Sequence, residues 1–194
     1  MDIDLIKRLR ETTGAGMMAA KQALVDADGD MDKAVDILRK AGNASAAKRA
    51  EREARAGVVE AYVHGGRIGV LVELNCETDF VARTEDFLTL AKDLAMQVAA
   101  SNPEFVKPED IPAAQIERER SVYAAEAEGK PAEVAGKIID GKMEKYYQAV
   151  CLLRQPFIKD PDKSVVDLLT EVIAKTGENI VVRRFSRLEL GQVD

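Results

Sequence analysis

The sequence predicts an α+β protein: an N-terminal three-helix bundle, a linker helix, and a core in which helices back a three-stranded antiparallel sheet. Three observations lead to this class. Residues 1–42 carry their apolar side chains at helical spacing only. From Gly57 the apolar pattern alternates with period two, as in half-buried strands. The chain closes on one further strand pattern, which needs the earlier strands as partners to form a sheet.

Residues 1–42 predict three short helices. "DLIKRLRE" places its apolar side chains on one face, and "GMMAAKQALVDA" repeats Met17, Ala20 and Leu24 at i, i+3 and i+7. "DMDKAVDILRKAG" follows the same period, with Asp30 expected as its N-cap and Gly42 as its C-terminal stop. Short amphipathic helices bury their apolar faces only against one another. The sequence therefore predicts a compact three-helix bundle over residues 1–42.

Residues 43–56 predict a linker helix between two domains. The stretch "NASAAKRAEREARAG" is rich in alanine and charge, so it favours a helix, but it lacks an apolar stripe for a core. It also holds a cluster of basic side chains, diluted by two glutamates: Lys48, Arg49, Arg52 and Arg55. A solvated helix and a weak nucleic-acid patch are the two interpretations.

Residues 57–194 are expected to form the α+β core domain. "VVEAYVH" and "RIGVLVEL" flank Gly65-Gly66, a two-residue hairpin signal. A polar turn, residues 75–83, leads into a helix that ends near "SNP". After a proline-punctuated loop, residues 113–127 and 132–153 predict an antiparallel helical hairpin. Its second helix carries a coiled-coil-like seam: Ile139, Met143, Tyr146, Val150 and Leu153.

The remainder of the core is predicted from three short patterns. "QPFIKDPD" indicates a loop, "SVVDLLTEVIAKTG" an amphipathic helix and "ENIVVRRFSRLEL" a strand. A single strand forms no sheet, so this last one is expected to pair with the hairpin as the third antiparallel strand.

Composition narrows the class of protein. The chain has 194 residues, 28 basic and 34 acidic, a net charge of −6 that argues against a dedicated nucleic-acid binder. Apolar runs stop well short of the roughly 18 residues that a membrane span needs. The N-terminus resembles no signal peptide, and the two cysteines have no C-x-x-C spacing. A cytoplasmic protein without bound metal, cofactor, nucleic acid or membrane is expected.

No enzyme signature emerges. The single histidine, His64, lies at a hairpin tip without a paired nucleophile. Cys76 is flanked by Glu77 and Asp79, acids that would raise rather than lower a thiol pKa. "TGAGMMAAK" fails as a phosphate loop, because alanine precedes the lysine and glutamine follows it. The protein is expected to bind a partner rather than catalyse a reaction.

The Met17-Met18 pair and the Asp79-Phe80 corner both suggest a surface that binds a partner, and each also has a purely structural interpretation. Adjacent residues on a helix cannot share one face, so the pair Met17-Met18 forms either core or an adaptable contact surface. Asp79 and Phe80 lie at a strand-to-helix corner, where a large ring is unusual. Asp79 suits a helix N-terminus capped by Thr78. Phe80 is either a core ring in register with Phe87 or an exposed anchor.

Three motifs in order along the chain resemble the translation elongation factor Ts family. "LRETTGAGMMAAKQAL" is similar to its N-terminal signature, "ELNCETDFVAR" to its second signature, and "GENIVVRRFSRLELG" to its C-terminal strand. The resemblance spans essentially the whole chain. The chain is shorter than two-subdomain members and resembles the short bacterial form, whose members pair as homodimers.

The resemblance implies a guanine-nucleotide exchange factor for the GTPase elongation factor Tu. It implies that the N-terminal bundle over residues 1–42 is ubiquitin-associated-like and docks on the GTPase through Arg10, Met17 and Met18. It also implies that the segment formed by Thr78, Asp79, Phe80 and Val81 approaches the partner's magnesium site. It further implies that residues 57–194 serve as the core and dimerisation domain, with the sheet edge and the helical seam as candidate dimer surfaces. One rival interpretation is a nucleic-acid binder that uses the basic helix from Lys48 to Arg55 together with Arg183, Arg184 and Arg187. A more distant rival is a thiol enzyme that uses Cys76.

Overall fold

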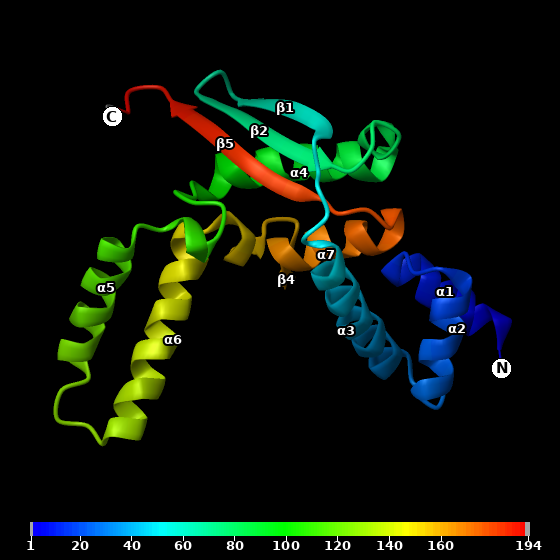
Figure 1. Ribbon diagram of the computed structural model, residues 1–194, viewed down its shortest axis with the longest axis horizontal. Coiled ribbons are helices and arrows are strands. Elements are labelled where there is room, and N and C mark those ends of the chain that lie inside the picture. The colour runs from blue at the N-terminus through cyan, green and yellow to red at the C-terminus, as the bar shows by residue number, and fades with distance from the viewer. Residues whose placement is uncertain (1, 193–194) are drawn as a thin grey trace. The chain divides into compact units, whose positions relative to one another are not determined.

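The computed structural model describes residues 2–192 and confirms the α+β class, with a three-stranded antiparallel sheet (Figure 1). Its α-helices are α1 (Ile3–Thr13), α2 (Met17–Asp26), α3 (Met31–Arg49), α4 (Glu85–Ser101), α5 (Ala113–Glu126), α6 (Ala132–Val150) and α7 (Val165–Thr176). Its strands are β1 (Ala56–His64), β2 (Ile68–Cys76), β3 (Pro156–Phe157), β4 (Asp160–Ser164) and β5 (Val181–Glu189). Three short 3-10 helices are η1 (Val81–Arg83), η2 (Pro108–Asp110) and η3 (Leu152–Arg154).

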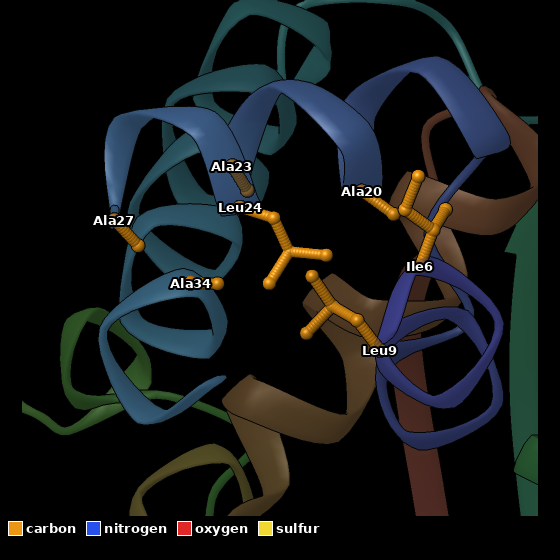
Figure 2. Close-up of a cluster of buried hydrophobic side chains, with 7 residues drawn as sticks. All are labelled: Ile6, Leu9, Ala20, Ala23, Leu24, Ala27 and Ala34. Atoms are coloured by element: carbon orange, nitrogen blue, oxygen red, sulfur yellow. The ribbon is translucent and has the colours of Figure 1, made fainter. Parts of the chain in front are cut away.

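Helices α1, α2 and α3 form the predicted N-terminal bundle. Asp2 caps α1 by accepting a hydrogen bond from the Asp4 backbone N–H, and Gly14 ends it with φ 67°, a conformation that glycine adopts without steric cost. Figure 2 shows the apolar side chains between the helices. Because most of them are alanines, the helix backbones can approach closely. The buried set is Ile6, Leu9, Ala20, Ala23, Leu24, Ala27 and Ala34.

The third helix does not stop where the sequence suggested. Asp30 caps α3 as expected, but Gly42 continues the helix, which ends at Arg49. No separate linker helix covers 43–56, because α3 includes residues 43–49, and residues 50–55 form a turn, a bend and a stretch without regular structure before β1. Glycine inside a helix costs only about 1 kcal/mol relative to alanine, and the alanine-rich stretch that follows offsets it. The boundaries 1–42, 43–56 and 57–194 stay a prediction of domain organisation, although α3 crosses the first.

The predicted hairpin joins β1 to β2. Gly65 and Gly66 have φ 55° and 69°, so both central turn residues adopt the positive φ that a tight hairpin needs. The last strand pairs with the hairpin, as predicted, and the strand order is β1-β2-β5. Helix α4 runs along one face of the sheet (Figure 1). Arg187 of β5 donates to the Ala99 carbonyl of α4 at 3.4 Å.

By compactness the chain divides into two units. One comprises the residues up to Glu60 with Glu73–Ala91 and Asp167–Val182. The other comprises Ala61–Val72, Lys92–Val166 and the residues from Arg183 onward. The N-terminal bundle and the turn after β2 therefore belong to the first unit, and the helical hairpin belongs to the second.

The second unit contains the predicted helical hairpin of α5 and α6. Two seam residues make contacts within the chain: Met143 is buried, and the Tyr146 hydroxyl accepts a hydrogen bond from the Gln115 side chain of α5 at 2.8 Å. Leu153 lies outside the seam helix, because α6 ends at Val150 and Leu153 belongs to η3. The segment "QPFIKDPD", predicted to be a loop, instead contains β3 and pairs it with β4. Buried Gln97 organises this ribbon, because its amide oxygen accepts from the Ile158 backbone N–H and its amide nitrogen donates to the Pro156 carbonyl.

Candidate partner-binding site

The turn after β2 presents an aromatic ring to solvent. Phe80 is 81% exposed, and Thr78 and Asp79 beside it are also exposed. Val81 is 5% exposed, and it anchors the start of η1 in the core. Of the two interpretations of Phe80, the core ring is therefore wrong. Phe87, seven residues further along the chain, is fully buried, and Phe80 takes no part in that core.

A glutamate far along the sequence holds this turn. Glu178, in the loop between α7 and β5, accepts hydrogen bonds from the backbone N–H groups of Glu77 and Thr78, both at 3.1 Å, through Oε2. Its Oε1 accepts from the Thr78 hydroxyl at 2.6 Å. Sequence reasoning missed Glu178 because 100 residues separate it from Thr78. The only signal available was its position at the start of the third motif.

The neighbouring loop residues extend this set of contacts. Asn179 donates its backbone N–H to the Glu77 carboxylate at 2.6 Å and its side-chain amide to the Arg52 carbonyl at 2.7 Å. Arg49, the last residue of α3, donates to the Gly177 carbonyl at 2.9 Å. The turn after β2, the loop before β5 and the end of α3 are thus joined by hydrogen bonds.

Cys76 lies beneath the turn and is fully buried. Its thiol donates to the Thr78 carbonyl at 3.2 Å. Burial raises the pKa of the Cys76 thiol, and the charges of Glu178 and Asp79 raise it further. A buried thiol that resists ionisation is a poor nucleophile, so the geometry disfavours the thiol-enzyme interpretation.

The three candidates in the N-terminal bundle lie at its surface. Met17 is 49% exposed and Met18 is 74% exposed, so neither belongs to the core cluster that Ala20 and Leu24 build. Arg10 is exposed, and its Nε donates to the Ala15 carbonyl at 3.3 Å, which orients it along the α1–α2 loop. Of the two interpretations of the methionine pair, core packing is therefore wrong in this chain.

A sequence model of the family described as Elongation factor TS matches residues 5–172. The chain belongs to the elongation factor Ts family. Among its relatives, Elongation factor Ts of Carboxydothermus hydrogenoformans is 61% identical over 191 residues, which cover 97% of this chain and 88% of that protein. Elongation factor Ts of Heliobacterium modesticaldum is 58% identical, with 97% and 89% covered. That of Thermodesulfovibrio yellowstonii is 56% identical, with 97% and 95% covered.

Family membership confirms the resemblance that the three motifs indicated, and the geometry bears on the rival interpretations. Three arginines of the supposed nucleic-acid patches make contacts within the protein: Arg49 with Gly177, Arg52 with Glu77, and Arg187 with Glu189.

Within residues 2–192, no group of three or more His, Cys, Asp or Glu side chains could hold a metal ion. In the same part of the chain, no helix combines the length and apolar character that crossing a membrane requires.

Proposed function

We propose that this elongation factor Ts family member is a guanine-nucleotide exchange factor for elongation factor Tu. The observation that carries the proposal is Phe80, which stays 81% exposed at the tip of a turn that hydrogen bonds hold on one side and buried Val81 on the other. An exposed ring on a braced turn suits insertion into another protein, because little conformational entropy is lost on binding. Family membership supplies the identity of the partner.

In the proposed mechanism the N-terminal bundle docks first and the turn acts afterwards. Arg10, Met17 and Met18 contact the GTPase, and adaptable methionine side chains suit such a surface. Thr78, Asp79, Phe80 and Val81 then form the segment that disturbs the magnesium and nucleotide site. Within it Phe80 is the inserted ring, Asp79 places a negative charge near the metal, and buried Val81 supports them from below.

Exchange follows from reciprocal coupling between two ligands of the GTPase. If the factor weakens GDP binding, then GDP weakens factor binding by the same free energy, so the two displace each other. A thousandfold faster release requires roughly 4 kcal/mol off the barrier. One contact at the rim of an interface supplies less than this. We therefore assign the effect to the ring together with docking energy from the bundle.

We extend the proposal to a homodimer that acts in the cytoplasm, without direct nucleic-acid or membrane contact and without catalysing a chemical reaction. Two members of the helical seam are engaged within the chain, because Met143 is buried and Tyr146 bonds Gln115 of α5. The sheet supports the dimer better, because Val63, Leu71 and Leu188 are exposed on its strands at 67%, 51% and 72%.

The test is release of a fluorescent GDP analogue from elongation factor Tu, measured with and without this chain in the presence of excess unlabelled GDP. We expect the chain to accelerate release by at least a hundredfold at saturating concentration. Release that is unchanged by the folded chain would contradict the proposal. A salt-sensitive RNA mobility shift in place of exchange would favour the nucleic-acid interpretation.

A further inference from the structure

We infer that Glu178 is a positioning residue for exchange: it holds the Thr78–Val81 turn so that Phe80 is presented in one orientation. The inference rests on the proposed function of that turn and assigns a role to a residue outside it. Glu178 lies in the loop between α7 and β5, and its carboxylate is the acceptor for both backbone N–H groups at the start of the turn and for the Thr78 hydroxyl.

The carboxylate also orients the Thr78 side chain. An ionised carboxylate only accepts hydrogen bonds, so the Thr78 hydroxyl must direct its proton toward Glu178. The lone pairs of that hydroxyl then face the Val81 backbone N–H, which lies 3.4 Å away. A continuous path of hydrogen bonds therefore runs from Glu178 through Thr78 to the first residue of η1.

The two ends of the exposed segment are fixed in different ways. At the Thr78 end, Glu178 accepts from the backbone N–H and the hydroxyl, while the carbonyl accepts from the Cys76 thiol. At the other end, Val81 and Ala82 are each 5% exposed, and the Ala82 N–H donates to the Thr78 carbonyl at 3.2 Å. Only Asp79 and Phe80 lie between these anchors. Because so short a span has few accessible conformations, loss of one anchor should free the ring to sample orientations unsuited to insertion.

Glu178 is itself held in place. Gly177 before it adopts φ 75° at the end of α7, and its N–H donates to the Ile173 carbonyl at 2.9 Å. Asn179 after it bonds Glu77 and the Arg52 carbonyl. The loop thus presents the carboxylate from a fixed backbone, which a positioning residue requires.

The experiment compares Glu178→Ala and Glu178→Gln with the wild-type chain in GDP release from elongation factor Tu. We expect Glu178→Ala to lower the maximal exchange rate at least fivefold while the chain stays folded. Glu178→Gln should stay within about threefold of wild type, because its amide oxygen can still accept both backbone N–H groups and its amide nitrogen can donate to Thr78. Asp110→Ala is the matched control, since Asp110 accepts the Lys107 N–H on a different turn.

A double-mutant cycle with Phe80→Ala separates positioning from general damage. If Glu178 acts through the ring, then Glu178→Ala should cause less than a twofold further loss once the ring is absent. A loss that multiplies in the double variant, an unchanged rate in Glu178→Ala, or a Glu178→Gln rate as low as that of Glu178→Ala would each overturn the inference.

Amide hydrogen exchange tests the same contact without the GTPase. The Glu77 and Thr78 amides should exchange at least tenfold faster in Glu178→Ala than in wild type, and nearly as slowly as wild type in Glu178→Gln. Unchanged protection in Glu178→Ala overturns the inference while leaving the proposed function intact. A wild-type chain that fails to release GDP overturns the proposed function instead. If Glu178→Ala does not fold, Glu178→Asp replaces it, because the shorter side chain draws the carboxylate away from Thr78.

Discussion

Phe80 and Phe87 are chemically identical residues with opposite environments. Phe87 is fully buried in α4, whereas Phe80 is 81% exposed on the turn that precedes it. Burying a ring of this size normally stabilises a protein by about 1.5–3 kcal/mol. The exposed ring of Phe80 does not provide this stabilisation. At the scale of single residues, the turn therefore keeps an apolar group at the surface, as expected of a contact residue.

Phe80→Ala should leave stability nearly unchanged and impair exchange. Removing an exposed ring changes the free energy of unfolding by no more than about 0.5 kcal/mol, whereas removing a core ring lowers it by about 3–5 kcal/mol. Exchange should fall at least tenfold, a loss of about 1.4 kcal/mol in transition-state stabilisation. Asp79→Asn is the comparison variant and should lose less, because it keeps the shape and removes only the charge. The paired measurements are Tm and GDP-release rate. A strongly lowered Tm with normal exchange by the folded fraction would contradict the assignment.

Both cysteines should resist alkylation in the folded chain. Burial raises the pKa of the Cys76 thiol, and it raises that of Cys151 to about 11. The reactive species is the thiolate, so iodoacetamide at about pH 8 should modify the native protein far more slowly than the urea-unfolded protein. The unfolded chain loses the two thiol protons at lower pH than the folded chain. The free energy of unfolding should therefore decline as pH rises above about 9. Mass spectrometry follows the modification; equal rates in both states would contradict the assignment.

The helices and strands differ in how far their own sequence determines them. Helix α3 passes through Gly42 to Arg49, and the ribbon of β3 and β4 forms in a segment of turn-forming residues. In the second case, the buried amide of Gln97 supplies hydrogen bonds to the Pro156 carbonyl and the Ile158 N–H. The bundle, by contrast, contains its own apolar cluster, because all seven buried members lie between Ile6 and Ala34.

Deletion of residues 1–42 should weaken binding to elongation factor Tu and leave the remaining chain folded. The reason is that the bundle's buried cluster lies entirely within the deleted segment, while the contacts of Arg49 and Arg52 with the loop before β5 are kept. Affinity is measured by titration of nucleotide-free GTPase, and folding by circular dichroism and thermal melting. An insoluble or molten truncated chain would show that the predicted domain boundary is wrong.

At the level of the whole molecule, the sheet is the surface through which we propose that two copies of the chain pair. Three of its exposed side chains, Val63, Leu71 and Leu188, are large and apolar. β1 and β5 are also edge strands, with backbone groups available for pairing along their outer sides. Isologous contact between two copies of the face that carries Leu71 would bury apolar surface on both copies at once.

Light scattering at micromolar concentration should report twice the 21.2 kDa chain mass. Leu71→Lys should shift the chain to the monomer, because burying a lysine without a partner is costly. Val122→Lys on α5 is the matched control, since Val122 is 47% exposed on the helical hairpin. A wild-type particle of single-chain mass would rule out the dimer. Dissociation by Val122→Lys alone would move the interface to the hairpin.

Features that depend on local spacing could be predicted from the order of the residues alone. Helical periodicity predicted the bundle and the hairpin of α5 and α6, and Gly65-Gly66 predicted the turn between β1 and β2. Three motifs were enough to indicate the family. Three features became clear only from the folded structure. Phe80 is exposed and not buried, and α3 continues through Gly42. Glu178 contacts a turn that lies 100 residues away in the sequence. Local periodicity reports which face of an element is apolar, whereas burial and long-range hydrogen bonds depend on which distant segments cover that face.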